Sequence, residues 1–283
     1  MFKNIFILIG VLGITSTEAA VLKLFTFEIR PELFYQRTAM GDYHKFREKT
    51  AKNYSLPKLQ GTFGVEFEGC CFFREMVGVG IGVGMMSLQC DKKAYYSMIE
   101  KGMAFNCTSR YKFRPSMTPL LFTFYYIPPV PIVQVTVGAG LGLYLTSADF
   151  LWEDEARLVD DPSIISFFST KGTLKGSKMG FHIGGRVACP ILKWLSVYGD
   201  TKFRVANVSP LKGETTVRMK MHIPSIIEID TTFIGDGKLW FDKKDEKFFG
   251  PFPEDLEPER QHMREGSIDF SGIKIGAGIM LRF

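Results

Sequence analysis

Apolar residues alternate strictly with glycine in the stretch VGVGIGVG, residues 77–84. A strand places successive side chains on opposite faces, so the apolar residues share one face and the glycines share the other. Glycine packs nothing and weakens a strand, which indicates that its face meets bulky neighbours. The spacing does not match the G-x-G-x-x-G loop of dinucleotide-binding proteins, and no amphipathic helix follows. A phosphate-binding loop is therefore excluded.

The same alternation recurs in seven further segments. Residues 132–145 keep their parity from end to end, with apolar residues on one face and small or polar residues on the other. In residues 111–127 the alternation is clear at first and then changes phase around Pro119. A β-bulge inserts one residue and would cause such a shift. The pattern predicts eight strands, at 25–30, 62–68, 77–84, 111–127, 132–145, 180–187, 195–205 and 273–283.

Short and long connections alternate between these strands. The short ones are 69–74, 127–131 and 188–193, and the long ones are 37–60, 90–110, 147–177 and 207–266. A soluble lipocalin-like or streptavidin-like barrel also has alternating strands, but nothing requires its connections to sort by length. An outer-membrane barrel has tight periplasmic turns, long external loops, apolar residues toward lipid and polar residues inside. We therefore predict an all-β fold, an eight-stranded antiparallel up-and-down transmembrane β-barrel. Its interior is narrow, so glycines make room for long side chains.

The first residues have the architecture of a secretory signal. Lys3 precedes the apolar run IFILIGVLGI, and the small residues of TSTEAA lead to an expected cleavage site near Ala19 or Ala20. This predicts a signal peptide over 1–20 and a barrel over 21–283. A buried strand or helix of a cytosolic protein is the alternative. No later apolar run reaches the length of about 18 residues that a spanning helix needs.

Composition narrows the partners and the redox chemistry. The formal net charge is +5 and dispersed, and export argues against nucleic acid, whereas anionic lipid heads remain suitable partners. Export to an oxidising compartment permits disulfides among the five cysteines, of which at least one stays unpaired. Cys90 and Cys107 lie in one predicted loop and are the preferred pair. The cysteine and histidine spacings complete no zinc site, so no metal or other cofactor is expected.

Two segments carry a resemblance to a known class. Phe283 follows apolar residues at alternate positions, Leu281 and Ile279, and the Pro-rich turn 126–131 leads into the glycine-containing segment 137–144. With the signal peptide, the chain resembles the small OmpA, OmpX and OmpW barrels of bacteria with two membranes. The resemblance implies recognition of the C-terminus by the barrel-assembly machinery, outer-membrane lipid and lipopolysaccharide as partners, and a monomer in the bacterial outer membrane. The 207–266 connection is longer than this class usually carries.

The predicted inner faces are rich in charges of both signs. They are Glu28, Arg30, Glu32, Glu66, Glu68, Lys112, Arg114, Arg186, Asp200, Lys202, Arg204, Lys274 and Arg282. Unpaired charges in a narrow, low-dielectric interior are costly, so we expect ion pairs and hydrogen bonds that plug the lumen. A narrow pore for small or amphipathic solutes is the alternative. Basic residues outnumber acidic ones in this set, so such a pore would prefer anions.

Two features invite a catalytic interpretation. Some small outer-membrane barrels modify lipids with a serine and a histidine, and His182 is the candidate here, but no serine stands in a recognisable neighbouring motif. Glu66 and Glu68 share a face as a glycosidase pair would, although a salt-bridge network explains them without a substrate. We expect no enzyme, and a structural, adhesive or surface-interaction role. Residues 226–232 with a turn at 235–237 predict an external hairpin, and Phe248, Phe249 and Phe252 leave room for a binding patch.

Overall fold

The computed structural model describes residues 24–50, 56–129, 133–242, 244, 249–253 and 262–283. The predicted signal peptide and Phe248 lie outside the described residues. The elements are β1 (Phe25–Arg37), α2 (Gly41–Thr50), β2 (Gly61–Phe73), β3 (Val77–Ser87), β4 (Cys90–Glu100), β5 (Met103–Tyr126), β6 (Gln134–Leu158), β7 (Ile165–Leu192), β8 (Leu195–Val205), β9 (Asn207–Val208), β10 (Lys212–Ile223), β11 (Ile227–Asp242), β12 (Phe249–Pro253), β13 (Met263–Glu265), β14 (Ile268–Asp269) and β15 (Gly272–Arg282). Among the described residues, no helix is long and apolar enough to cross a membrane.

Eight strands pair into a closed ring. In order around the ring they are β1, β2, β3, β5, β6, β7, β8 and β15, and β15 pairs back with β1. All of these pairs are antiparallel, and the eight members correspond to the eight strands expected from the alternation. The sheet is larger than the predicted barrel, however, because β4, β10, β11, β12 and β13 belong to it as well.

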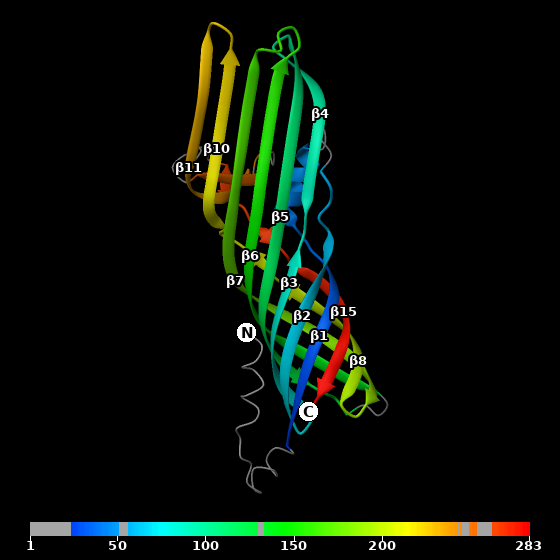
Figure 1. The fold of residues 1–283 in the computed structure, drawn as a ribbon. Coiled ribbons are helices and arrows are strands. Elements are labelled where there is room, and N and C mark those ends of the chain that lie inside the picture. The colour runs from blue at the N-terminus through cyan, green and yellow to red at the C-terminus, as the bar shows by residue number, and fades with distance from the viewer. Residues whose placement is uncertain (1–23, 51–55, 130–132, 243, 245–248, 254–261) are drawn as a thin grey trace, which may run out of the picture.

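The ring continues upward as an extension of the same sheet (Figure 1). Strands β5, β6 and β7 have 24, 25 and 28 residues, well beyond the 9–11 or so that a tilted strand needs to cross a bilayer. Strand β4 pairs with β5 on one side of the extension, and the β10–β11 hairpin pairs with β7 on the other. The start of β1, the end of β15 and the short turns lie at the end of the ring away from the extension (Figure 1).

Three predicted loops are therefore wrong in part. Residues 90–110 and 147–177 form hairpins rather than loops, and 207–266 contains the β10–β11 hairpin. An external hairpin is expected in this last segment, but its turn lies at 224–226, where Ser225 has a φ of 60°. Gly235 and Gly237 are inside β11, opposite Thr215 and Gly213 of β10. A Gly-Asp-Gly sequence favours a turn only where the chain must reverse.

The predicted bulge near Pro119 is also wrong. Strands β5 and β6 stay in one register from Phe105 opposite Leu158 to Tyr126 opposite Val137. What changes along β5 is the environment of its two faces. In the extension the inward side is apolar and the outward side is charged, whereas in the ring the outward side is apolar. The hydrophobic pattern therefore changes face although the backbone keeps its parity.

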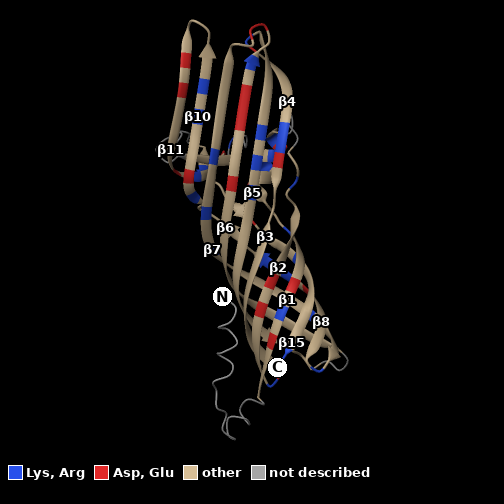
Figure 2. Cartoon of the chain, in the orientation of Figure 1, with Lys and Arg blue, Asp and Glu red and all other residues tan. Residues whose placement is uncertain are grey.

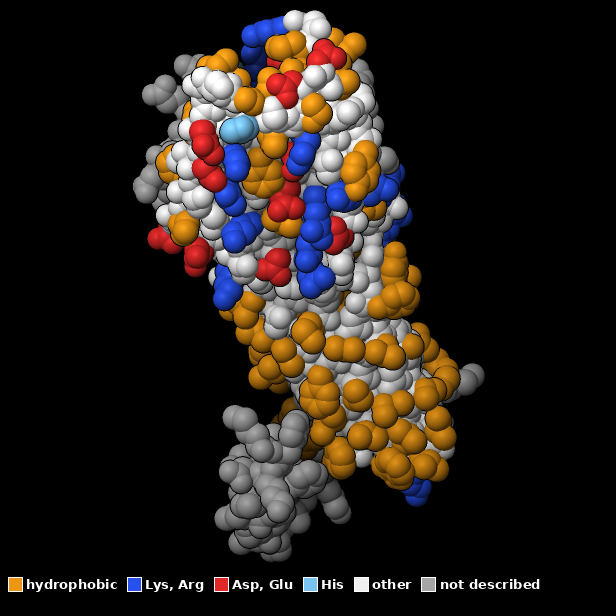
Figure 3. Space-filling model, turned by 45° about the horizontal axis from the view of Figure 1, so that its top comes forward, with side chains coloured by type: hydrophobic (Ala, Val, Ile, Leu, Met, Phe, Trp, Pro, Cys, Tyr) orange, Lys and Arg blue, Asp and Glu red, His pale blue; other side chains and the backbone are white. Residues whose placement is uncertain are grey.

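An apolar belt surrounds the ring. Leu33, Phe63 and Ile81 point outward and keep 70%, 79% and 72% of their surface exposed. Figure 3 shows apolar side chains over the ring and charged ones over the extension. Strand β3, with 11 residues, has the length of a tilted transmembrane strand. Soluble monomers rarely expose apolar areas of this extent, and membrane barrels present such a band to lipid.

The concave side of the extension carries its own apolar core. Helix α2 contributes Tyr43 and Phe46, and Phe249 of β12 packs against them and against Phe113 of β5. The rings of Phe113 and Phe150 stack with centroids 4.4 Å apart. This core is continuous with buried residues of the upper ring, among them Phe34, Met86, Met117 and Leu121. The end of the ring that adjoins the extension is thus closed by packed side chains.

Candidate functional site

The interior of the ring holds a balanced set of buried charges. Five carboxylates and five cations are each at most 5% exposed. They are Glu28, Glu32, Glu66, Glu68 and Asp200 with Arg30, Arg186, Lys202, Arg204 and Lys274. All ten lie on strands β1, β2, β7, β8 and β15. Figure 2 shows charges of both signs on the strands of the ring.

Glu66 is the centre of the upper part of this network. Its carboxylate lies 2.6 Å from the Lys202 Nζ and 3.2 Å from the Lys274 Nζ, and it also accepts from the Arg204 guanidinium. Arg204 donates in addition to the Gln36 side-chain oxygen at 3.0 Å. One carboxylate thus holds three cations taken from two neighbouring strands, β8 and β15.

Arg186 and Asp200 occupy the middle of the network. Arg186 Nη2 lies 3.2 Å from a Glu68 carboxylate oxygen and 3.5 Å from Asp200 Oδ2. Lys202 and Lys274 approach the same Asp200 oxygen at 3.8 and 3.6 Å. The Arg186 guanidinium also lies over the Tyr198 ring, 4.4 Å from its centroid. Buried cations gain from such aromatic faces when water is excluded.

Arg30 closes the lower part of the network. Its guanidinium contacts Glu28 and lies 3.4 Å from Glu68, and its Cζ is 5.1 and 5.0 Å from the ring centroids of Phe72 and Tyr125. Arg282 reaches Glu28 from the rim at 2.7 Å and is partly exposed. Burying ions costs several kcal/mol each unless partners compensate them. An equal number of opposite charges offsets much of this cost, although buried polar atoms such as Arg186 Nε and Asp200 Oδ1 have no hydrogen-bond partner.

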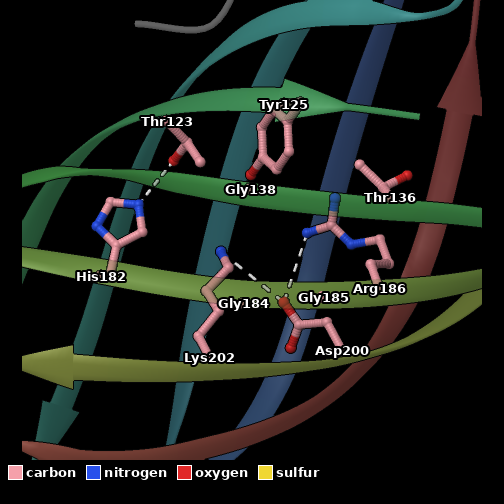
Figure 4. A pocket seen from close by; sticks show the side chains of 10 residues that line it. All are labelled: Thr123, Tyr125, Thr136, Gly138, His182, Gly184, Gly185, Arg186, Asp200 and Lys202. Atoms are coloured by element: carbon pink, nitrogen blue, oxygen red, sulfur yellow. Dashed lines mark hydrogen bonds and ion pairs between the residues drawn. The ribbon is translucent and has the colours of Figure 1, made fainter. Parts of the chain in front are cut away.

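The interior contains a small cavity beside the charged network. A cavity of about 10 Å³ lies among Thr123, Tyr125, His182, Arg186 and Lys202, which Figure 4 shows from close by. This is the room that roughly one water molecule needs. The His182 Nε2 lies 2.9 Å from the Thr123 hydroxyl and the ring is buried. The histidine considered for catalysis is therefore hydrogen-bonded to a threonine inside the ring.

The glycine faces fit around Tyr125. A Cβ built on Gly80 would lie 2.9 Å from the Tyr125 ring, and one built on Gly138 would lie 2.6 Å from it. The Tyr125 hydroxyl donates to Glu68. At Gly276 a Cβ would meet the Glu32 carboxylate. A Cβ on Gly82 would be accommodated, because its nearest atom would be 3.6 Å away. Packing therefore does not require glycine at every such position of the Val-Gly repeat.

Two residues predicted inside the ring are outside it. Lys112 and Arg114 lie on the outward face of β5 in the extension, where Lys112 is opposite Leu151 and Arg114 is opposite Asp149. Their assignment to the interior was wrong because the hydrophobic pattern changes face along β5.

The predicted Cys90–Cys107 disulfide is wrong, and both thiols are free. Cys90 is opposite Phe113 and Cys107 is opposite Tyr96, so six residues separate them along the hairpin. At about 3.3 Å per residue the separation is roughly 20 Å, far beyond the 7 Å or so that a disulfide allows between Cα atoms. Cys70, Cys71 and Cys189 lie in strands β2 and β7 rather than in turns, and are free as well.

The predicted assembly signal lies on the outer face of β15. Phe283 exchanges two backbone hydrogen bonds with Phe27, at 2.9 and 3.2 Å, and its side chain is exposed. Ile279 is exposed on the same side, and Leu281 is partly buried opposite Ile29. The backbone of Phe283 thus extends the pairing of β15 with β1 that closes the barrel, while its phenyl side chain stays exposed.

No protein-family model and no curated protein matches the chain. Among solved structures, a major outer membrane protein of Thermus thermophilus is 14% identical, with a TM-score of 0.38 and coverage of 92% of this chain and 99% of that one. The outer membrane protease OmpT of Escherichia coli is 7% identical, with a TM-score of 0.24 and coverage of 92% and 96%. A TodX deltaS2S3 mutant, a monoaromatic hydrocarbon channel, is 10% identical, with a TM-score of 0.24 and coverage of 91% and 90%. Similarity at this level does not assign a function to the chain.

Proposed function

We propose that the protein is an integral outer-membrane β-barrel of the small OmpA, OmpX and OmpW type, with a plugged lumen and a structural, adhesive or surface-interaction role. The observation that carries the proposal is the charge-balanced, packed interior inside an apolar belt. Five carboxylates and five cations are buried inside the ring, and the cavity beside them has a volume of about 10 Å³. A solute or hydrated ion needs a wider path than this, and a folded core covers the outward mouth.

The extension supports the surface role. Its outward face presents charged side chains in ordered cross-strand positions, such as Arg218 of β10, whose guanidinium donates to Asp230 of β11 at 3.0 and 2.7 Å. Sites on paired strands are held more precisely than sites on loops, which supports recognition of other molecules at the cell surface. No catalytic role is proposed, because His182 and Glu66 are engaged in the interior network.

Conductance across a planar bilayer tests the plugged lumen. The refolded protein should insert, as judged by a detergent-gel band that shifts on heating, and should give no discrete channel events. Replacing Arg186 and Glu68 together by glycine removes two long side chains of the middle network while keeping the charge balance, and this variant should still give no discrete channel events because the apolar core closes the mouth of the ring. Discrete events from the unaltered protein would favour the alternative function, a narrow pore.

A further inference from the structure

We propose that the upper concave face of the extension binds an amphipathic helix of a partner protein, whose apolar stripe covers the sheet and whose basic side chain pairs with Asp154. This face is the inward side of β4, β5, β6, β7, β10 and β11 where these strands rise above helix α2 (Figure 1). It includes one apolar residue from each strand, namely Met98, Phe105, Leu158, Phe168, Met221 and Ile229. The proposal deepens the surface-interaction role and rests on it, because it places the extension outside the cell.

The register of the strands shows that this face continues the buried core. Val217 of β10 is buried, and Met219 and Met221 follow on the same side of the strand. Met221 is opposite Ile229 of β11, and the two keep 40% and 46% of their surface exposed. The other side of these strands is charged, as at Arg218. The extension is therefore a sheet whose apolar side is only partly covered.

The lower part of the same sheet side shows what kind of element fits it. There helix α2 packs Phe46 against Tyr111 of β5 and Trp152 of β6, with ring centroids 5.5 and 5.8 Å apart. A sheet with one apolar side buries that side against a second layer. Tyr96 and Trp152 are partly buried against the core, whereas the apolar residues above them belong to no buried cluster of the described residues. A second helix above α2 would complete the layer.

Asp154 of β6 lies in the middle of this apolar face. Its cross-strand neighbours are Ser109 of β5 and Phe168 of β7. The Asp154 Oδ1 atom is buried without a hydrogen-bond partner, and no lysine or arginine of the described residues forms an ion pair with this carboxylate. Burial raises the pKa of the carboxyl, although the Ser109 and Trp152 side chains beside it lower the pKa in part. A carboxylate in such surroundings costs stability unless a cation is supplied.

The charge of Asp154 and the width of the face define the chemistry of the partner. The other charged side chains on the inward side of the upper strands are Lys92 and Glu100, which have opposite charges and lie on the edge strand β4. The face is five strand spacings wide, about 24 Å, which a helix of about 16 residues spans. Methionine side chains adapt to the shape of such a helix. An apolar stripe interrupted by one lysine or arginine would therefore match this face.

Fluorescence anisotropy of a labelled helical peptide of about 18 residues tests the proposal, with the refolded full chain in phosphatidylcholine nanodiscs and empty nanodiscs as the blank. The peptide carries leucines along one side of the helix and a single lysine in the middle of that stripe. A second peptide has methionine in place of the lysine. Asp154→Asn should weaken binding of the lysine peptide by about tenfold or more, and should change binding of the methionine peptide by less than about twofold.

Two further variants separate this site from general attraction. Glu153→Gln is the matched control, because it removes a carboxylate from the next residue of β6, on the outward side, opposite Arg110 and Ser169. It should leave the affinity for both peptides unchanged. Met219→Ser combined with Met221→Ser removes apolar surface from the face and should weaken binding of both peptides by about tenfold.

Three results would overturn the proposal. They are an equal loss of lysine-peptide binding in Asp154→Asn and Glu153→Gln, an equal loss of both peptides in Asp154→Asn, and a dimer of the protein alone that the two serine changes abolish. The last result, seen by native mass spectrometry, would show that a second copy covers the face. Each of these results leaves the barrel intact as long as the heat-modifiable band is present, whereas a native protein without that band would contradict the proposed function instead.

Discussion

Replacing Glu66 by glutamine should destabilise the barrel more than any other single loss of a carboxylate in the interior. Glu66 is the buried partner of Lys202, Lys274 and Arg204, at 2.6 Å, at 3.2 Å and in direct contact. The change keeps the size of the side chain and removes one of five interior carboxylates, so the interior acquires an uncompensated positive charge. Breaking a buried ion pair in this way costs about 3 to 5 kcal/mol of unfolding free energy.

Arg204 offers a compensating change. In the described ion pairs Arg204 is bonded to Glu66 and to no second carboxylate. Glu66→Gln combined with Arg204→Met therefore restores the balance of charges and replaces the guanidinium by an apolar chain. Because apolar replacement of a buried ion pair is often neutral, the double variant should recover most of the lost stability. Non-additivity between the two changes is the signature of direct coupling.

Urea unfolding in lipid vesicles measures these free energies, with the heat-modifiable gel band as the readout of folded protein. Glu214→Gln is the matched control, because Glu214 is exposed on the outward face of β10 and should change stability by less than about 0.5 kcal/mol. A loss below about 1 kcal/mol for Glu66→Gln, or a double variant weaker than the single one, would refute the assignment of Glu66 as the centre of a desolvated network.

Three further predictions concern the wall, the extension and the C-terminus. Val79→Arg should lower the unfolding free energy by about 2 to 4 kcal/mol, because Val79 is on the outer, apolar face of the ring. Gly80→Leu should lower it by about 1 to 3 kcal/mol, because the new side chain would meet Tyr125. Urea titration measures both, and two harmless changes would contradict the assignment of inner and outer faces. Burial raises the pKa of Asp154 in the extension, so the folded state favours the protonated carboxyl. Asp154→Asn should therefore become more stable than the native protein as the pH rises above about 4, which urea titrations at several pH values measure. A difference in unfolding free energy that stays constant with pH would argue against this. Removing Phe283 should impair insertion and leave export intact, as membrane fractionation would show; normal insertion would exclude a terminal signal.

The alternation along the chain was sufficient to predict the ring, because a wall between lipid and a charged interior forces opposite chemistry onto alternate residues. Val79 and Gly80 illustrate this, one exposed outside and the other packed inside. The charges that meet in the interior were also predictable, since most of them lie on the polar faces of these strands. Their pairing was not, because contacts such as Lys202 with Glu66 join strands that are not neighbours in the ring.

The extension escaped prediction for a physical reason. Above the belt the outward face meets water and the inward face meets a protein core, so the apolar face of β5 is the opposite one there. Tyr111 and Phe113 are buried inward while Lys112 points outward, and the reversal imitates an inserted residue. The same reversal made the long connections look like loops and suggested a disulfide within one of them.

The unbroken register of β5, β6 and β7 restricts which length changes the chain can accept. Inserting one residue into the upper part of one of these strands would exchange its core side chains with its water-facing ones, whereas inserting two would preserve both faces. Lengthening at the hairpin tips, by contrast, adds residues beyond the last pair and disturbs neither face. Variation in the reach of the extension should therefore accumulate at the tips or in steps of two residues.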